Sequence, residues 1–176
     1  MDVDHGSSGH EAAATLLALG HRSLALFNTS PRYTYSGHCE QGFHAALVAF
    51  GGSVESVVVD GGMTEESAAA LAREMFSLAG PPTTFVCGND AMALGVMHAI
   101  AERGLRVGVD VSVIGCNDIP VGRFVSPGLS SFAAPIEDVG RALVEFLHRQ
   151  MHSEVEPPEA KVFAPVFVPR GSHGRR

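Results

Sequence analysis

The segment from Phe85 to Leu129 constrains the fold more than any other part of this chain, because two short apolar runs in it each end in polar residues. The run that ends at Cys87 is followed by Gly-Asn-Asp and then by apolar residues at helical spacing. The run that ends at Gly115 is followed by Cys-Asn-Asp. In a parallel α/β sheet, the carboxyl ends of neighbouring strands form the ligand crevice. We therefore expect Asn89 and Asn117 to face one cleft, the layout of a small-molecule receptor.

Apolar runs separated by turn signals predict alternating strands and helices along the whole chain. Strands are expected at Ser23–Asn28, Glu55–Val59, Thr84–Cys87, Val111–Gly115, Leu129–Ala133 and Lys161–Val168. Helices are expected at 8–19, 38–50, 64–78, 89–104 and 136–151. Ser7 or Ser8 is expected to cap the first helix, and a polar loop at 29–37 precedes the second. The spacing is that of βαβ units and predicts an α/β fold with a doubly wound parallel sheet.

Composition fits one globular domain and excludes several classes of protein. The chain has 176 residues, of which 45% are hydrophobic and 18% charged, enough for an ordinary core. No apolar run approaches the ~18 residues needed to span a bilayer, and the polar start MDVDHGSSGH does not resemble a signal peptide. Three cysteines without C-x-x-C spacing favour a cytoplasmic location. A net charge of −7 argues against a direct nucleic-acid surface.

Motifs typical of enzymes do not appear in the sequence. Neither a P-loop nor a G-x-G-x-x-G turn after a strand is present, and the only lysine, Lys161, lies on a late expected strand. No G-x-S-x-G motif occurs, and spacing alone supports no Ser-His-Asp constellation. We therefore expect no enzymatic activity, no catalytic residue and no cofactor. An α/β enzyme remains a third hypothesis that would require a nucleophile–base pair or a metal cluster.

Seven segments together resemble the effector-sensing region of LacI/GalR-type bacterial transcription regulators, in that family's order and spacing. They are LLALGHRSLAL, CEQGF, NDAMALG, GLRVGVDVSVIG, NDIP, SPGLSSF and FAPVFVPRGS. The resemblance implies a type I periplasmic-binding-protein-like fold, in which two doubly wound lobes close on a ligand. It also implies that the chain is mainly the second, C-terminal lobe.

The domain organisation that the resemblance implies divides a sensor domain at residues 1–170 into several parts. These are a second lobe at 5–132, a helix at 136–151 that returns to the first lobe, a final strand at 161–168 and a tail at 171–176. The first lobe and the DNA-binding helix-turn-helix are expected to lie outside this chain. The helix has an apolar stripe that must then fold back, dimerise or stay exposed, and we expect poor solubility as a monomer. The ending VPRGSHGRR resembles an expression-tag scar but is treated as native.

Six residues are candidates for effector binding through the resemblance: Asn89, Asn117, Met63, Tyr35, Tyr33 and Cys39. Four of them also have a simpler interpretation. Asn89 is a suitable helix N-cap, Asn117 a turn residue, Cys39 a small buried apolar group and Met63 an ordinary packing residue of its loop. In the family, Asn117 is usually Asp and Cys39 is commonly Arg, so the usual sugar contacts are altered here. A degenerate sensor that binds nothing strongly is therefore also considered.

The resemblance also implies a dimer face formed by Leu94, Met97, His98, Phe124 and Val125. Its alternative is packing of the same helix on the sheet. The three cysteines could gather near the cleft with His38 beside one of them, but buried structural cysteines are the commoner case, so no metal site is predicted.

We expect the ligand-sensing and dimerisation region of a LacI/GalR-type regulator that responds to a small polar, sugar-like effector. It is expected to be a homodimer, to touch no membrane, and to reach DNA only through a helix-turn-helix outside this chain. The alternative is a stand-alone solute-binding module.

Overall fold

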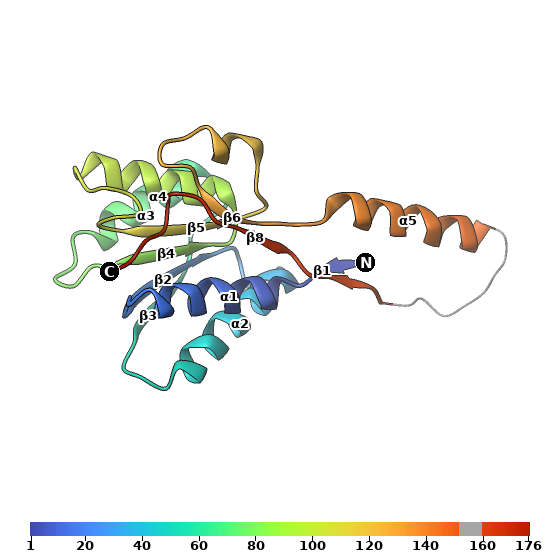
Figure 1. Cartoon of the computed structure of the whole chain (residues 1–176), viewed down its shortest axis with the longest axis horizontal. Helices are drawn as coiled ribbons and strands as arrows, with labels where there is room; N and C mark the ends of the chain where they lie inside the picture. The colour runs from blue at the N-terminus through green and yellow to red at the C-terminus, as the bar shows by residue number, and fades with distance from the viewer. Residues whose placement is uncertain (152–159) are drawn as a thin grey trace.

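A six-stranded sheet forms the centre of the molecule, whose computed structural model describes residues 1–151 and 160–176 (Figure 1). Its strands are β2 (Ser23–Asn28), β3 (Glu55–Asp60), β4 (Thr84–Cys87), β5 (Ser112–Cys116), β6 (Ser130–Ala133) and β8 (Val166–Val168). Their order is β3-β2-β4-β5-β6-β8. The first five are parallel, as expected, whereas β8 is antiparallel to β6. The chain leaves and re-enters the sheet at the same end of β6, so β8 runs in the opposite direction.

Helices cover both faces of this sheet. They are α1 (His5–Ala18), α2 (Thr34–Phe50), α3 (Glu65–Met75) and α4 (Asp90–Glu102), with a short 3-10 turn, η1, at Pro120–Arg123. Side chains alternate between the faces along each strand. In β2, Leu24 and Leu26 pack in one core cluster with α1 and α2, while Ala25 and Phe27 pack in the other with α3 and α4. Burial on both faces explains why the central strands β2, β4 and β5 are apolar almost throughout.

Two helices begin earlier than the sequence suggests. α1 begins at His5, because the Asp4 carboxylate accepts a 2.9 Å hydrogen bond from the Ser7 amide and acts as the cap instead of Ser7 or Ser8. α2 begins at Thr34 instead of residue 38. The Ser36 hydroxyl donates to the Thr29 carbonyl at 2.8 Å, which fixes the turn into α2. The expected polar loop is therefore four residues shorter.

Helices α1 and α2 approach each other so closely that only glycine fits at two contact points. A Cβ atom on Gly9 would collide with the backbone carbonyl of Cys39, and one on Gly42 would collide with the carbonyl of Gly6. Because both obstacles are backbone atoms, neither side could yield by rotating a side chain. The two helices thus form one tightly packed layer on one face of the sheet.

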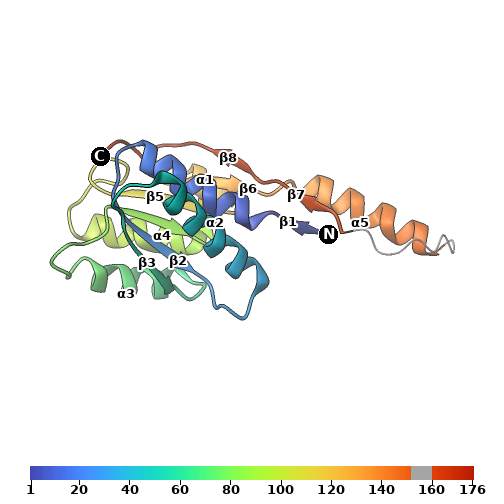
Figure 2. The ribbon, with the colours of Figure 1, turned by 90° about the horizontal axis from the view of Figure 1, so that it is seen from below.

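Helix α5 (Ile136–Met151) projects away from the sheet, as both views show (Figures 1 and 2). Val144 is 66% exposed and Met151 is 81% exposed. A small parallel sheet lies near its base, formed by β1 (Asp2–Val3) and β7 (Val162–Phe163). The single strand expected at 161–168 is wrong: Pro165, which cannot donate to a ladder, separates β7 from β8, and the two belong to different sheets.

The C-terminal residues pack against the amino-terminal end of the sheet. Ser172 is fully buried, and its hydroxyl donates to the Val113 carbonyl at 2.6 Å while the Val113 amide donates to the Ser172 carbonyl at 2.8 Å. The Gly174 carbonyl lies 3.0 Å from Nε2 of His21. The tail therefore covers the amino-terminal ends of the strands, opposite to the carboxyl ends where the ligand cleft is expected. Within the described residues, no helix combines the length and apolar character that a bilayer crossing requires.

Candidate functional site

Asn89 and Asn117 lie at the same edge of the sheet. Asn89 follows β4 and Asn117 follows β5, and these strands are parallel neighbours. Asn89 caps α4: its Oδ1 accepts a 2.7 Å hydrogen bond from the Met92 amide. Its Nδ2 donates to the Met63 carbonyl at 3.4 Å, which ties the loop after β3 to the start of α4. The capping interpretation of Asn89 is confirmed, while its contact with a ligand stays a prediction.

The Asn117 side chain is exposed on a backbone that L-residues adopt rarely. Its φ is 101°, and Asp118 follows with a φ of 49°. Asn and Asp tolerate this left-handed region better than other residues, but two in succession require support from surrounding contacts. The Asn117 backbone amide donates a hydrogen bond to the Phe132 carbonyl at 2.9 Å. The turn thus holds the Asn117 side chain out towards solvent at the carboxyl end of β5.

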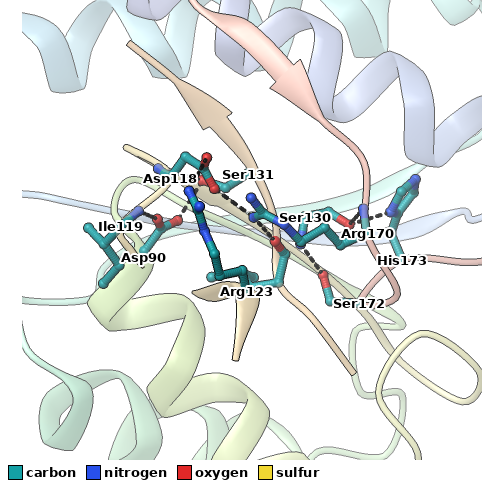
Figure 3. Close-up of polar contacts among 10 residues, drawn as sticks. Asp90, Asp118, Ile119, Arg123, Ser130, Ser131, Arg170, Ser172 and His173 are labelled. Carbon is teal, nitrogen blue, oxygen red and sulfur yellow. Dashed lines mark hydrogen bonds and ion pairs between the residues drawn. The ribbon is translucent and has the colours of Figure 1, made fainter. Parts of the chain in front are cut away.

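A polar network centred on Asp90 holds this turn in place (Figure 3). The buried Asp90 carboxylate accepts hydrogen bonds from the Ser131 hydroxyl at 2.6 Å and from the Ile119 amide at 2.7 Å. The Ser131 oxygen in turn accepts from the Asp118 amide at 3.1 Å. The backbone amides of Asp118 and Ile119 are therefore held by the Ser131 hydroxyl and the Asp90 carboxylate.

Arg170 connects the same turn to the C-terminal segment. Its Nη1 lies 2.6 Å from Oδ1 of Asp118 in an ion pair, and it also donates to the Leu129 carbonyl at 2.6 Å. Arg123 lies 3.9 Å from the other Asp118 oxygen. Burial raises the pKa of Asp90, an effect that the hydrogen bonds from Ser131 and Ile119 oppose.

A small hollow opens beside this turn, between the strand ends and the helix pair α1 and α2. It has room for about one water-sized group, ≈ 10 Å³. Its lining comprises His5, Ser8, Gly9, Ala12, Asn28, Tyr35, Cys39, Val86, Cys87, Gly88, Gly115, Cys116 and Phe132. Tyr35 and Cys39 are thus brought together in this lining. The other four candidates, Asn89, Asn117, Met63 and Tyr33, lie outside this lining.

Sequence reasoning did not identify the part of the lining that α1 supplies. His5 and Ser8 belong to the first turns of α1, which was expected to begin only at residue 8. The Asp4 carboxylate, a good N-cap three residues before Ser7, was the available signal. Asn28 at the end of β2 was also overlooked, although it follows the same strand-end rule as Asn89 and Asn117.

The aromatic rim consists of three neighbouring rings, of which Tyr33 and Tyr35 are stacked and His5 is tilted by 46° against Tyr35. His5 and Tyr35 have ring centroids 5.3 Å apart, and Tyr33 stacks on Tyr35 at 5.4 Å. Tyr35 lies in the first turn of α2 and not in a loop, because that helix starts early. Tyr33 is 45% exposed, and Met63 is 52% exposed on the neighbouring loop. Burial is the main cause that lowers the pKa of His5.

All three cysteines are free thiols in the lining of the hollow. Burial raises the pKa of Cys39 to about 11 and that of Cys116 to about 12, and it raises the pKa of Cys87 still further. These thiols are therefore neutral and weakly nucleophilic at physiological pH. Within residues 1–151 and 160–176, no group of three or more His, Cys, Asp or Glu side chains is arranged to hold a metal ion.

The five residues proposed for a dimer face differ widely in exposure. Phe124 is 80% exposed, and His98 is exposed with its Nε2 3.3 Å from Glu102. In contrast, Met97 is 7% exposed, and Leu94 and Val125 pack partly against the core. Internal packing therefore accounts for Met97, whereas Leu94 and Val125 are only partly buried and Phe124 and His98 are exposed, so the dimer face stays a prediction.

Three comparisons with known proteins agree on one family. Residues 13–173 match the model of the periplasmic binding protein-like domain. The probable HTH-type transcriptional repressor ExuR of Bacillus subtilis (strain 168) is 32% identical over 130 residues, covering 73% of this chain and 39% of the relative. A sugar-binding LacI-family regulator from Escherichia coli, complexed with phosphate, superposes with a TM-score of 0.86 at 27% identity, covering 99% of this chain and 63% of that one.

The structure of the lac repressor dimer bound to operator and the anti-inducer ONPF has a TM-score of 0.86 at 25% identity, covering 98% of this chain and 59% of that one. The chain belongs to the periplasmic binding protein-like domain family, in the form found in LacI/GalR-type transcription regulators. It spans about half the length of the curated relatives it matches.

Proposed function

We propose that this chain is the ligand-sensing and dimerisation region of a LacI/GalR-type transcription regulator that responds to a small polar effector. The observation that carries the proposal is the gathering of polar strand ends after β2, β4 and β5 beside one hollow. Carboxyl ends of parallel strands are where open α/β sheets bind ligands. The relatives support a regulator over an enzyme, since they are named as transcriptional repressors or regulators.

In this proposal Asn117 and the rings of Tyr33 and Tyr35 contact the effector from one side. An amide both donates and accepts, which suits a hydroxyl-rich ligand, and the stacked rings offer a flat apolar face. A second lobe, resting on the apolar stripe of α5, supplies the opposite wall. Effector binding then favours one arrangement of the lobes over another, and a DNA-reading head senses the difference.

A calorimetric screen of the chain against neutral sugars, purines and nucleosides tests the proposal. We expect at least one to bind, and Asn117→Gly to weaken that binding by about tenfold or more through the loss of one hydrogen bond to the ligand. Asn117 is exposed and has a φ of 101°, which glycine adopts without strain, so the substitution leaves both the turn and the core intact. The matched control is Val48→Ala on the outer face of α2, 81% exposed. Absence of binding by every compound, or equal binding by both variants, contradicts the proposal.

The second candidate is a stand-alone solute-binding module, which has the same fold and uses the same strand ends. Coding sequence upstream of this chain distinguishes the two. An in-frame helix-turn-helix supports a regulator, and a secretory signal peptide supports a solute-binding module.

A further inference from the structure

The hollow has a neutral polar and thiol-rich lining, in contrast to the charged network beside it. Ser8, Asn28 and Tyr35 contribute hydroxyl and amide groups, and Cys39 and Cys116 contribute thiols. Phe132 and Val86 complete it with apolar surface. A ligand group that enters this space leaves water and meets uncharged partners.

The groups of the lining that could become charged are held neutral. Burial raises the pKa of Cys39 to about 11 and that of Cys116 to about 12, so both thiols keep their protons near neutral pH. Burial also lowers the pKa of His5, and the ring is therefore uncharged above its ordinary value of 6.5. These directions agree with the geometry, in which each group is partly enclosed by the helix pair α1 and α2.

The charges that surround the hollow disfavour an anion. The buried Asp90 carboxylate lies directly behind the wall of the hollow, because a Cβ atom on the lining residue Gly115 would collide with Oδ1 of Asp90. The cations nearest to this network are already engaged: Arg170 pairs with Asp118 at 2.6 Å, and Arg123 lies 3.9 Å from the same carboxylate. An anionic ligand group would therefore lose its hydration without gaining a counter-charge, which is costly.

We propose that this hollow selects the effector by charge: it accepts an uncharged group, such as a hydroxyl or a ring carbon, and rejects a carboxylate or phosphate at that position. The inference rests on the proposed function, because it names the chemical class of the effector at the same site. It assigns Cys39 and Cys116 the role of specificity determinants, because each occupies the wall of the hollow with a neutral, compact side chain.

Matched pairs of neutral and anionic ligands test the inference in calorimetric titrations of the whole chain. The pairs are D-galactose with D-galacturonate, D-ribose with ribose 5-phosphate, and inosine with inosine 5′-monophosphate, with inorganic phosphate alone as a further anion. We expect the neutral member of any binding pair to bind at least about 30-fold more tightly, the effect of leaving a desolvated charge unpaired. Equal or tighter binding of the anionic member overturns the inference and leaves the proposed function standing. Failure of every compound to bind overturns both.

A charged substitution in the lining of the hollow provides a second test of the inference. Cys116→Lys is suitable because Cys116 is only half-buried at the end of β5, so a lysine stem can reach the opening. We expect this variant to reduce the neutral-to-anion preference by about tenfold or more. Val48→Lys, with the same charge change on exposed α2 surface, should leave the preference unchanged. An identical shift in both variants would mean that net charge, and not the hollow, sets the preference.

Discussion

The Ser131 hydroxyl donates a 2.6 Å hydrogen bond to Oδ1 of Asp90, joining the first turn of α4 to β6 across 41 residues of sequence. Asp90 is 1% exposed and Ser131 is fully buried. The Asp90 carboxylate also accepts a hydrogen bond from the Ile119 backbone amide, and the Ser131 hydroxyl accepts one from the Asp118 backbone amide. The turn that presents Asn117 therefore depends on both side chains.

Asp90→Ala should therefore lower the free energy of unfolding by about 2–4 kcal/mol, because it leaves the Ser131 hydroxyl and the Ile119 amide buried without an acceptor. Asp90→Asn keeps one oxygen acceptor and should cost less. Urea unfolding followed by circular dichroism measures both. A loss below about 0.5 kcal/mol for the alanine variant would contradict the role of this network.

The tail should contribute as much to stability as a core element. Ser172→Ala removes the acceptor for the Ser130 amide, 2.8 Å away, and the donor to the Val113 carbonyl, and should cost about 2–3 kcal/mol in urea unfolding. Ser53→Ala on the exposed loop before β3 is the control and should change stability by less than about 0.5 kcal/mol. Equal effects of the two substitutions would mean that the tail is only loosely attached.

Stability should fall as the pH drops below about 6.5. Burial is the main cause that lowers the pKa of His5, His21 and His173 in the folded chain. Between their folded values and 6.5 the unfolded chain binds more protons, so acidification favours unfolding. Unfolding free energies at pH 5.5 and 7.5 measure the effect. His21→Gln should shrink the difference between the two pH values, whereas His10→Gln on the exposed side of α1 should not.

The apolar face of α5 should drive self-association of this chain. Replacing Val144 and Leu147, which are 66% and 51% exposed, by glutamate should shift size-exclusion elution towards the monomer. Because both side chains are exposed, the free energy of unfolding should change by less than about 0.5 kcal/mol. A wild-type chain that elutes as a monodisperse monomer would contradict this expectation.

Phe124 tests the dimer face that the family resemblance implies at η1 and α4. Phe124→Glu should dissociate a dimer formed through η1 and α4 while keeping the fold, because the ring is 80% exposed. Val48→Glu supplies an equal charge change elsewhere. Sedimentation velocity measures the mass, and an unchanged dimer in the Phe124 variant would refute this face.

The sequence was sufficient to predict the strand ends but not the hollow between them. Near-continuous apolar runs such as Leu24–Phe27 identify strands buried on both faces, and the polar residue after each run follows from the direction of a parallel sheet. The lining contributed by His5 depends on where α1 starts and on how it crosses the strand ends. That is decided by packing between elements distant in sequence, which periodicity does not encode.

The same limit applies to Asp90, which sequence reasoning treated only as part of a helix start. Its partners Ser131 and Arg170 lie 41 and 80 residues away along the chain, and only the strand order β4-β5-β6-β8 brings them together. The antiparallel direction of β8 was missed for a related reason. The βαβ spacing predicts parallel strands and carries no information about a final strand that pairs in the opposite direction with β6.

The fit of Gly9 and Gly42 between α1 and α2 has an evolutionary consequence. A methyl group at either position would wedge the two helices apart and reshape the chamber beneath them, although neither substitution introduces a new chemical function. Drift at these two glycines is thus a route by which descendants of this protein could come to recognise larger molecules while every polar contact is retained.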